Sequence, residues 1–181
     1  MQRSRSIRLG VVQPHTRVGA QAPSNLDRAL RYVEEAAGDG IDLLVFPETY
    51  PGPAQAVDRF DVLEPLSRAA RDNGIDLVAG TTIETEGGHH ISELVIDRTG
   101  TLKGAYHRSH PRAEIYYGLY SGGPFWDIRY QPGDALPVFD MGWGILGVGV
   151  CSEVFVPEVA RGLALKGAEV CVFPTGIMIE D

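Results

Sequence analysis

The alternation of two residue patterns along the chain constrains the fold more than any other feature. Short apolar runs of strand length, such as 42–46 and 144–150, are separated by segments whose apolar residues recur at helical spacing. Leu26, Leu30 and Val33 form such a helical face. Because a helix carries the chain back to the start of the next parallel strand, this alternation predicts an α/β fold with a mainly parallel sheet.

The same patterns give the expected elements in chain order. One antiparallel hairpin, of residues 91–96 and 101–107 around Asp97–Gly100, interrupts the alternation. Residues 108–137 show no clear period, and an irregular stretch of that length is often functional. No linker or repeat divides the chain, so we predict a single domain over 1–181. The expected strands are 7–13, predicted to be buried, 42–46, 76–83, 144–150 and 169–173, and the expected helices are 24–38, 61–73 and 157–166. Ser24 has the residue type of an N-cap, Gly38 and Gly74 are expected just past helix ends, and Pro157 is expected in the first turn of the last helix.

Composition and charge exclude several classes of partner. The net charge of -8 opposes binding to a phosphate backbone, so nucleic acid is not an expected partner. Two cysteines cannot build a disulfide framework, and the first residues lack the apolar stretch of a signal peptide. The apolar runs are too short to cross a bilayer. We therefore predict a cytoplasmic protein without a membrane partner.

Two potentially reactive side chains directly follow predicted strands. Glu48 follows the run 42–46, and Cys151 follows the run 144–150. Reactive groups of α/β sheets collect beyond the carboxyl ends of the strands. A carboxylate beside a thiol accepts its proton and leaves a thiolate nucleophile, and Gly149 permits close approach of the backbone. The sequence thus indicates a nucleophile and base pair.

Simpler interpretations exist for each of these residues alone. A cysteine in an apolar run is usually a small buried hydrophobe, and we expect this of Cys171. Taken alone, Cys151 has the same interpretation and Glu48 is a solvated loop acid. The histidines have no third ligand at a recognisable spacing, so no metal site is predicted.

Taken together, the motifs resemble the nitrilase superfamily of carbon–nitrogen hydrolases. Each motif is short, but their order along nearly the whole chain is that of the family. The matching segments are IRLGVVQ at 7–13, DLLVFPE at 42–48, YHRSH at 106–110, QPGD at 131–134 with PVF at 137–139, GVGVCSE at 147–153, and PEVAR at 157–161 with KGAEV at 166–170.

The resemblance implies an αββα sandwich, often assembled into dimers or larger oligomers, so a homo-oligomer is expected. It implies no cofactor and a Glu–Lys–Cys constellation. Carried onto this chain, it makes Cys151 the nucleophile that forms a thioester with the acyl group. Glu48 activates the thiol and then water. The residue at position 108 stabilises the oxyanion of the tetrahedral intermediate.

This chain departs from the family pattern at that last position. Arg108 stands where the family has lysine; it stays charged and donates hydrogen bonds, but its planar fork is larger. Lys103 is no substitute, because positions 103 and 108 on one strand point to opposite faces. Ser152 does not match the Cys-Trp-Glu of true nitrilases, which favours a small amide or N-carbamoyl substrate. Glu153 stands where many relatives have aspartate.

The family commonly has a second acid in the loop after the lysine. Glu114 is the first candidate and Asp127 the second, because the stretch from Asp127 resembles one in N-carbamoyl amino acid amidohydrolases. Glu153 is a further binding or supporting candidate. Family members continue through more strands and a helix, so we expect the C-terminal part of the family fold to be missing. The chain is then a fragment, or needs a partner to cover a sheet edge.

The predicted function is cleavage of a non-peptide C–N bond through a cysteine thioester. Arg108 and the short chain leave open a non-catalytic binding or scaffold subunit. An acyl or amide transferase, or an ammonia-supplying glutaminase unit, would use the same thioester. Side chains of Cys151, Glu48 and Arg108 within hydrogen-bonding reach would favour a working site, and an Arg108 turned to solvent would favour the non-catalytic alternative.

Overall fold

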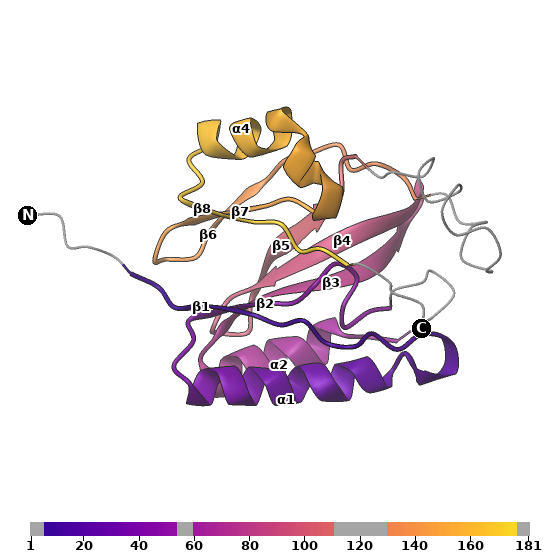
Figure 1. The fold of residues 1–181 in the computed structure, drawn as a ribbon, viewed down its shortest axis with the longest axis vertical. Helices are drawn as coiled ribbons and strands as arrows, with labels where there is room; N and C mark the ends of the chain where they lie inside the picture. The colour runs from indigo at the N-terminus through magenta and orange to yellow at the C-terminus, as the bar shows by residue number, and fades with distance from the viewer. Residues whose placement is uncertain (1–5, 54–59, 111–129, 177–181) are drawn as a thin grey trace, which may run out of the picture.

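The computed structural model describes residues 6–53, 60–110 and 130–176. Two sheets face one another between outer layers of helix (Figure 1). Helices α1 (Ser24–Gly38) and α2 (Leu63–Asn73) cover the outer face of the larger sheet, and α4 (Pro157–Leu165) covers the smaller one (Figure 1). The predicted αββα sandwich is therefore confirmed.

The larger sheet, sheet A, has five strands and the smaller, sheet B, has three. Sheet A runs in the order β1 (Leu9–Val11), β2 (Leu43–Val45), β3 (Asp76–Thr85), β4 (Gly88–Ile96) and β5 (Leu102–His107). Sheet B runs in the order β6 (Val138–Asp140), β7 (Ile145–Val148) and β8 (Val170–Val172). Two 3-10 helices, η1 (Gly19–Gln21) and η3 (Cys151–Phe155), complete the described elements.

Sheet A changes from parallel to antiparallel pairing at β3. Strands β1, β2 and β3 pair in parallel, whereas β3, β4 and β5 pair antiparallel. The predicted hairpin is present, and its turn is closed by Gly100 N donating to the Asp97 carbonyl at 2.8 Å. The prediction of a single hairpin is wrong, because His89 and His90 extend β4 and pair with Glu84 and Ile83 of β3. Pairing with the long neighbouring strand β3 holds His89 and His90 in a strand, although their own preference for strand structure is weak.

Two apolar cores hold the layers together. The first lies between sheet A and its helices and includes Val33, Leu66 and Leu77. The second lies between the two sheets and includes Val78 and Leu146. Because side chains alternate along a strand, one face of sheet A contributes to each core. The candidate site lies beside the core between the two sheets.

Two predictions of burial are wrong, both on edge strands. The first strand was expected to be buried, but Leu9 is 46% and Val11 76% exposed. Both side chains share a face with core residues of β2, yet the described part of sheet B has fewer strands than sheet A and does not cover the β1 margin. Cys171 is likewise exposed on the edge strand β8 rather than buried.

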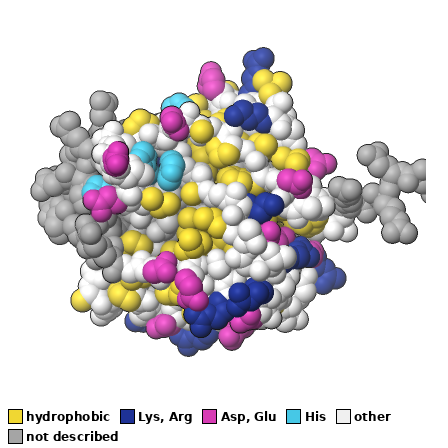
Figure 2. Space-filling model, turned by 180° about the vertical axis from the view of Figure 1, so that it is seen from behind, with side chains coloured by type: hydrophobic (Ala, Val, Ile, Leu, Met, Phe, Trp, Pro, Cys, Tyr) yellow, Lys and Arg dark blue, Asp and Glu magenta, His cyan; other side chains and the backbone are white. Residues whose placement is uncertain are grey.

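The helix ends follow the predicted chemistry except in α1, where Gly38 is the last helical residue rather than the residue past the end. Gly74 ends α2 in the left-handed conformation, and Pro157 occupies the first turn of α4. Ser24 is not an N-cap: it is the first helical residue, and its hydroxyl donates to the Gln21 carbonyl at 2.7 Å. In the described part of the chain, every helix is too short or too polar to serve as a membrane span. Figure 2 shows charged side chains of both signs around apolar ones on one face.

Candidate active site

The structure brings together three predicted site residues from separate segments. Glu48 follows β2, Arg108 follows β5, and Cys151 begins η3 after β7. Arg108 Nη1 lies 2.8 Å from Glu48 Oε1. The thiol of Cys151 donates a hydrogen bond to the Glu48 carboxylate. The carboxylate of Glu48 therefore stands between a thiol and a guanidinium.

Glu48 is held by a loop that folds over the face of sheet A. The side chain is only 8% exposed, so it is not a solvated loop acid. The loop crosses Gly80 so closely that a Cβ at this position would lie 2.3 Å from the backbone nitrogen of Thr49. Gly176 N, beyond β8, donates to Glu48 Oε2 at 3.3 Å. Close backbone packing thus places the carboxylate between the ends of the two sheets.

Burial raises the pKa of Glu48 above its ordinary value. The charge of Arg108 and hydrogen bonds from Cys151 and Gly176 act in the opposite direction without reversing the shift. A raised pKa makes the ionised carboxylate a stronger base than an exposed glutamate. This is the property that a group needs to take a proton from a thiol.

Cys151 lies at a sharp turn between β7 and η3. Its φ of 50° is in the left-handed region, where non-glycine residues are uncommon and which recurs at functional sites. Its backbone N–H donates to the Pro174 carbonyl at 2.8 Å, which ties the turn to the end of β8. Gly149 is needed here, because a Cβ would lie 2.4 Å from the ring of Phe173. The glycine expected to allow close approach does so.

The pKa of Cys151 is raised, first by burial and then by the charge of Glu48. The resting residue is therefore a thiol rather than a preformed thiolate. The Ser152 backbone N–H and Arg108 favour the thiolate but do not outweigh the other effects. A nucleophile of this kind depends on a base that accepts its proton during attack, and Glu48 is in contact with it.

Arg108 points into the molecule and is 1% exposed. Nη1 donates to Glu48, and Nη2 donates to the hydroxyl of Ser152, the residue after Cys151. Its Nε has no hydrogen-bond partner among the described residues. Lys103, which was rejected as a substitute, is exposed on β5. The geometry expected of a non-catalytic protein, with Arg108 turned to solvent, is not found.

Glu153 is fully buried and holds the site together from behind. It connects η3, which begins with Cys151, to residues 106–110, which include Arg108. Its carboxylate accepts hydrogen bonds from Tyr106 Oη (2.9 Å), Ser109 N (2.8 Å), Ser109 Oγ (2.7 Å), His110 N (2.9 Å) and Val150 N (2.7 Å). These contacts occupy the oxygens of the Glu153 carboxylate with donors of the protein itself.

The two candidates for the second acid, Glu114 and Asp127, lie outside the described residues. Another acid near the site, Glu93 on β4, was missed. Its side chain is fully buried, and neither carboxyl oxygen has a hydrogen-bond partner among the described residues. Burial, and then the charge of Glu48, hold the pKa of Glu93 well above its ordinary value. The sequence signal was an acid at an inward position of the apolar strand 91–96.

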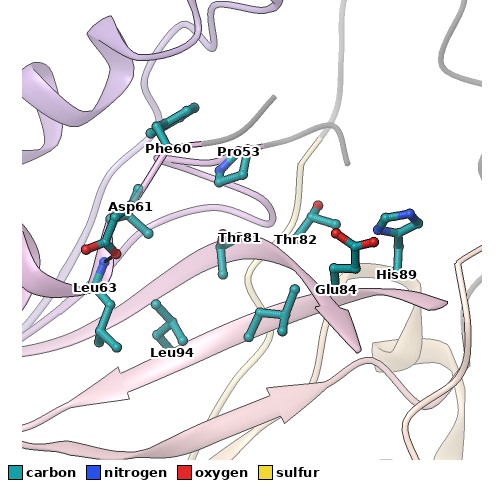
Figure 3. Close-up of a pocket in the computed structure, with 11 residues that line it drawn as sticks. Pro53, Phe60, Asp61, Leu63, Thr81, Thr82, Glu84, His89 and Leu94 are labelled. Atoms are coloured by element: carbon teal, nitrogen blue, oxygen red, sulfur yellow. Dashed lines mark hydrogen bonds between the residues drawn. The ribbon is translucent and has the colours of Figure 1, made fainter. Parts of the chain in front are cut away.

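Histidines and a neighbouring cavity lie apart from these groups. The rings of His90 and His107 are 4.8 Å apart, but no three metal-binding side chains gather within the described ranges. A cavity of about 570 Å³ lies beside β3, β4 and the start of α2, and Figure 3 shows Thr81 and Leu94 on its strand side and Phe60 at its rim. Its lining includes none of Glu48, Arg108 and Cys151.

Comparisons with known proteins agree with this arrangement. The nitrilase of Pyrococcus abyssi is 28% identical, over 96% of this chain and 66% of its own length. The omega-amidase NIT2 of Danio rerio is 31% identical, over 92% of this chain and 62% of its own length. The N-carbamoylputrescine amidase of Oryza sativa is 28% identical, over 84% and 53%. The chain thus spans between about half and two thirds of the length of these relatives.

Solved structures give the same result. An amidase from Nesterenkonia sp. superposes with a TM-score of 0.77 at 26% identity, covering 99% of this chain and 68% of that one. In one of its variants, the acetamide moiety of fluoroacetamide is added covalently at the active-site cysteine. The family model described as carbon-nitrogen hydrolase matches residues 8–180. This chain therefore belongs to the carbon–nitrogen hydrolase family of the nitrilase superfamily.

Proposed function

We propose that this protein hydrolyses a C–N bond of a small amide or N-carbamoyl compound, with Cys151 as nucleophile and Glu48 as base. The observation that supports this most is the buried Glu48 carboxylate, which contacts both the Cys151 thiol and the Arg108 guanidinium. Nucleophile, base and a cationic donor are the parts that acyl transfer needs.

The contacts support a two-step reaction. Glu48 accepts the thiol proton as the Cys151 sulfur attacks the carbonyl carbon, and the carbonyl oxygen becomes an oxyanion. Arg108 and the Ser152 N–H, which already faces the sulfur, are the nearby donors for that charge. The C–N bond then breaks, and the leaving nitrogen takes the proton from Glu48.

The thioester that remains is hydrolysed through the same base. Glu48 removes a proton from water as its oxygen attacks the thioester carbon, and collapse of the intermediate returns the proton to the sulfur. The acid is released and the thiol is restored. Every atom of this proposed reaction comes from the amide, water, Cys151 and Glu48.

An amide or carbamoyl substrate is favoured over a nitrile. Relatives with amidase names and an amidase structure are among the similar proteins, and Ser152 occupies the position at which true nitrilases have tryptophan. The substrates named for these relatives are not assigned to this chain. Which amide this chain accepts depends partly on residues 111–129, outside the described ranges.

A second candidate is a binding subunit without turnover. The Arg108–Glu48 ion pair favours it, because a cation 2.8 Å from the base stabilises the ionised form and weakens its pull on the thiol proton. A transferase would share the thioester and differ only in its acceptor. Cytoplasmic location and homo-oligomer formation stay predictions.

Fluoroacetamide is a direct probe of the proposed nucleophile. We expect mass spectrometry to find an acetamide adduct on Cys151 in a Cys171→Ser background, which removes the exposed second thiol. Cys151→Ala is the matched control and should give no adduct. Labelling that appears only after denaturation would contradict the proposal. With an amide panel, release of acid in water indicates a hydrolase, and preferential transfer to hydroxylamine indicates a transferase.

A further inference from the structure

Glu93 is a buried acid that the proposed mechanism does not use. It lies in the middle of sheet A, on β4, with β3 on one side and β5 on the other. Its side chain is 0% exposed, and both carboxyl oxygens lack hydrogen-bond partners among the described residues. Buried polar groups without partners are rare and call for an explanation.

The strand register places Glu93 on the face of sheet A over which the loop carrying Glu48 passes. Glu93 pairs with Gly80 on β3 and Tyr106 on β5, so its side chain shares their face, directed toward sheet B. Gly80 is the residue over which the loop carrying Glu48 passes, with the nitrogen of Thr49 2.3 Å from a Cβ built there. The charge of Glu48 acts directly on Glu93.

The two acids differ in what stabilises a negative charge. Glu48 is paired with the guanidinium of Arg108 at 2.8 Å and accepts further hydrogen bonds. Within the described ranges Glu93 has neither cation nor donor, and a carboxylate ion buried in that way would cost several kcal/mol or more. When the two acids share one proton, Glu48 is therefore the ionised group and Glu93 the protonated one.

We propose that Glu93 is a positioning residue that keeps a proton inside the site, so that Glu48 and Glu93 form a carboxyl pair carrying one proton and one negative charge. The proposal rests on the proposed function, since its effect on catalysis passes through Glu48. Two acids this close lose their protons in steps that belong to the pair. The pair sets an upper pH limit for activity.

The limit arises when the second proton leaves. A second negative charge beside Glu48 opposes ionisation of the Cys151 thiol, whose pKa the Glu48 charge already raises. It also opposes formation of an oxyanion. Among the described residues, the charged or titratable groups around the pair are Arg108 after β5, Tyr106 on β5, Tyr130, and Cys151 and Glu153 in η3.

Alkylation of Cys151 by iodoacetamide measures this effect without turnover. Glu93→Gln keeps the size and polarity of the side chain and removes its proton equilibrium. In a Cys171→Ser background, we expect equal alkylation rates for both proteins at acid pH. At alkaline pH the Glu93→Gln protein should react about fivefold faster, because the second charge is absent. Glu84→Gln, the same change at an exposed position of β3, should match the parent protein throughout.

Infrared difference spectra test the proton itself. We expect the carbonyl stretch of one protonated carboxyl group at neutral pH in the parent protein and its loss in Glu93→Gln. A Glu93→Asp variant keeps a titrating acid and should retain the band. An unchanged spectrum together with overlapping alkylation profiles would overturn the proposal, and neither measurement depends on finding the substrate.

Thermal unfolding gives a third reading if the variant is less stable. The folded pKa of Glu93 is raised, so the folded protein keeps a proton that the unfolded chain releases. This group's contribution to stability is complete below the ordinary glutamate pKa and is lost as pH rises toward the folded pKa. The melting temperature of the parent should therefore fall with rising pH relative to Glu93→Gln. Parallel curves would contradict a proton on Glu93.

Discussion

Glu153 and Glu48 are both buried acids near Cys151, yet their surroundings differ. Glu153 accepts backbone and hydroxyl hydrogen bonds from Val150, Ser109 and Tyr106, all within 2.9 Å. Glu48 accepts from one guanidinium, one thiol and a longer 3.3 Å contact. A carboxylate whose oxygens are occupied by several donors is held in one place, whereas one with few donors keeps a lone pair free to accept a proton.

This difference indicates that Glu153 supports the site, whereas Glu48 takes part in the reaction. Glu153 joins the turn after β5 to the turn after β7, and so fixes Arg108 and Cys151 relative to each other. Glu48 lies in the space that this frame leaves and has a raised pKa. Changes to Glu48 should therefore lower the rate by more than the accompanying loss of stability explains. Changes to Glu153 should affect both.

The largest expected effect is that of Glu48→Gln. An amide of the same size cannot accept the thiol proton, so kcat/KM should fall about a thousandfold, within the range of general-base catalysis. The melting temperature should also fall, because the buried guanidinium of Arg108 loses its counter-charge. In the parent protein, the rate should fall as pH drops through the raised pKa of Glu48, above the ordinary value of 4.5.

Initial rates measured against pH give both the loss of rate and the position of the acid limb. Glu34→Gln, on the exposed side of α1, is the control. An acid limb at the ordinary glutamate pKa, or a Glu48→Gln protein with parental rates, would remove Glu48 from the role of base. Neither Glu48 nor Glu153 would then be the base of the reaction.

Arg108→Ala should have the next largest effect. It removes a buried cation that contacts both Glu48 and Ser152, and loss of such a donor costs on the order of a hundredfold in rate. Because Arg108 lowers the pKa of Glu48, its loss should also move the acid limb to higher pH. Arg108→Lys keeps the charge and should retain most of the activity.

The two variants are best compared by kcat and KM with one amide. Equal rates for Arg108→Ala and the parent would show that the guanidinium stabilises no transition-state charge. An Arg108→Lys protein that gains activity many-fold would show that the arginine restrains Glu48 more than it assists, and would favour the binding-subunit alternative for the parent.

The predictable part of the molecule is local. Apolar runs ending at Pro47 and Cys151 were sufficient to place the base and nucleophile after two strands, because strand length and chain reversal leave local signals. The unpredictable part depends on contacts between distant segments. The hydrogen bonds of Glu153 join residues more than forty positions apart, and no local pattern encodes them.

Exposure could not be predicted for the same reason. Val11 and Cys171 lie in apolar runs typical of buried strands, but burial depends on what covers each strand. Val11 lies at a margin of sheet A that sheet B leaves uncovered, whereas Cys171 is on the outer face of sheet B, beside α4. In the sequence, Glu93 is visible as an acid within the apolar run that forms β4. Its significance appears only when the register places it beside Gly80 and the loop of Glu48.

Glu153→Gln should lower both stability and rate. An amide offers one acceptor oxygen and places an NH₂ group against N–H donors, so buried donors lose their partner. We expect a loss of about 2 kcal/mol in the free energy of unfolding and about a tenfold loss in kcat/KM. Denaturant titration and initial rates measure the two effects. The exposed Glu158→Gln on α4 is the matched control, and a variant that loses rate alone would make Glu153 a direct participant.

Gly80→Ala should have the smallest effect and tests the Glu48 side of the comparison. The new Cβ would lie 2.3 Å from Thr49 N and 2.7 Å from the Pro47 carbonyl oxygen, so the loop must move. We expect about 1–3 kcal/mol of destabilisation and a fewfold loss of rate as Glu48 shifts. Gly38→Ala, with nothing within 4 Å, should stabilise α1 by up to about 1 kcal/mol at unchanged rate. If both alanine variants keep parental kinetics, close packing on β3 does not position the base, and the contacts with Arg108 and Gly176 must suffice.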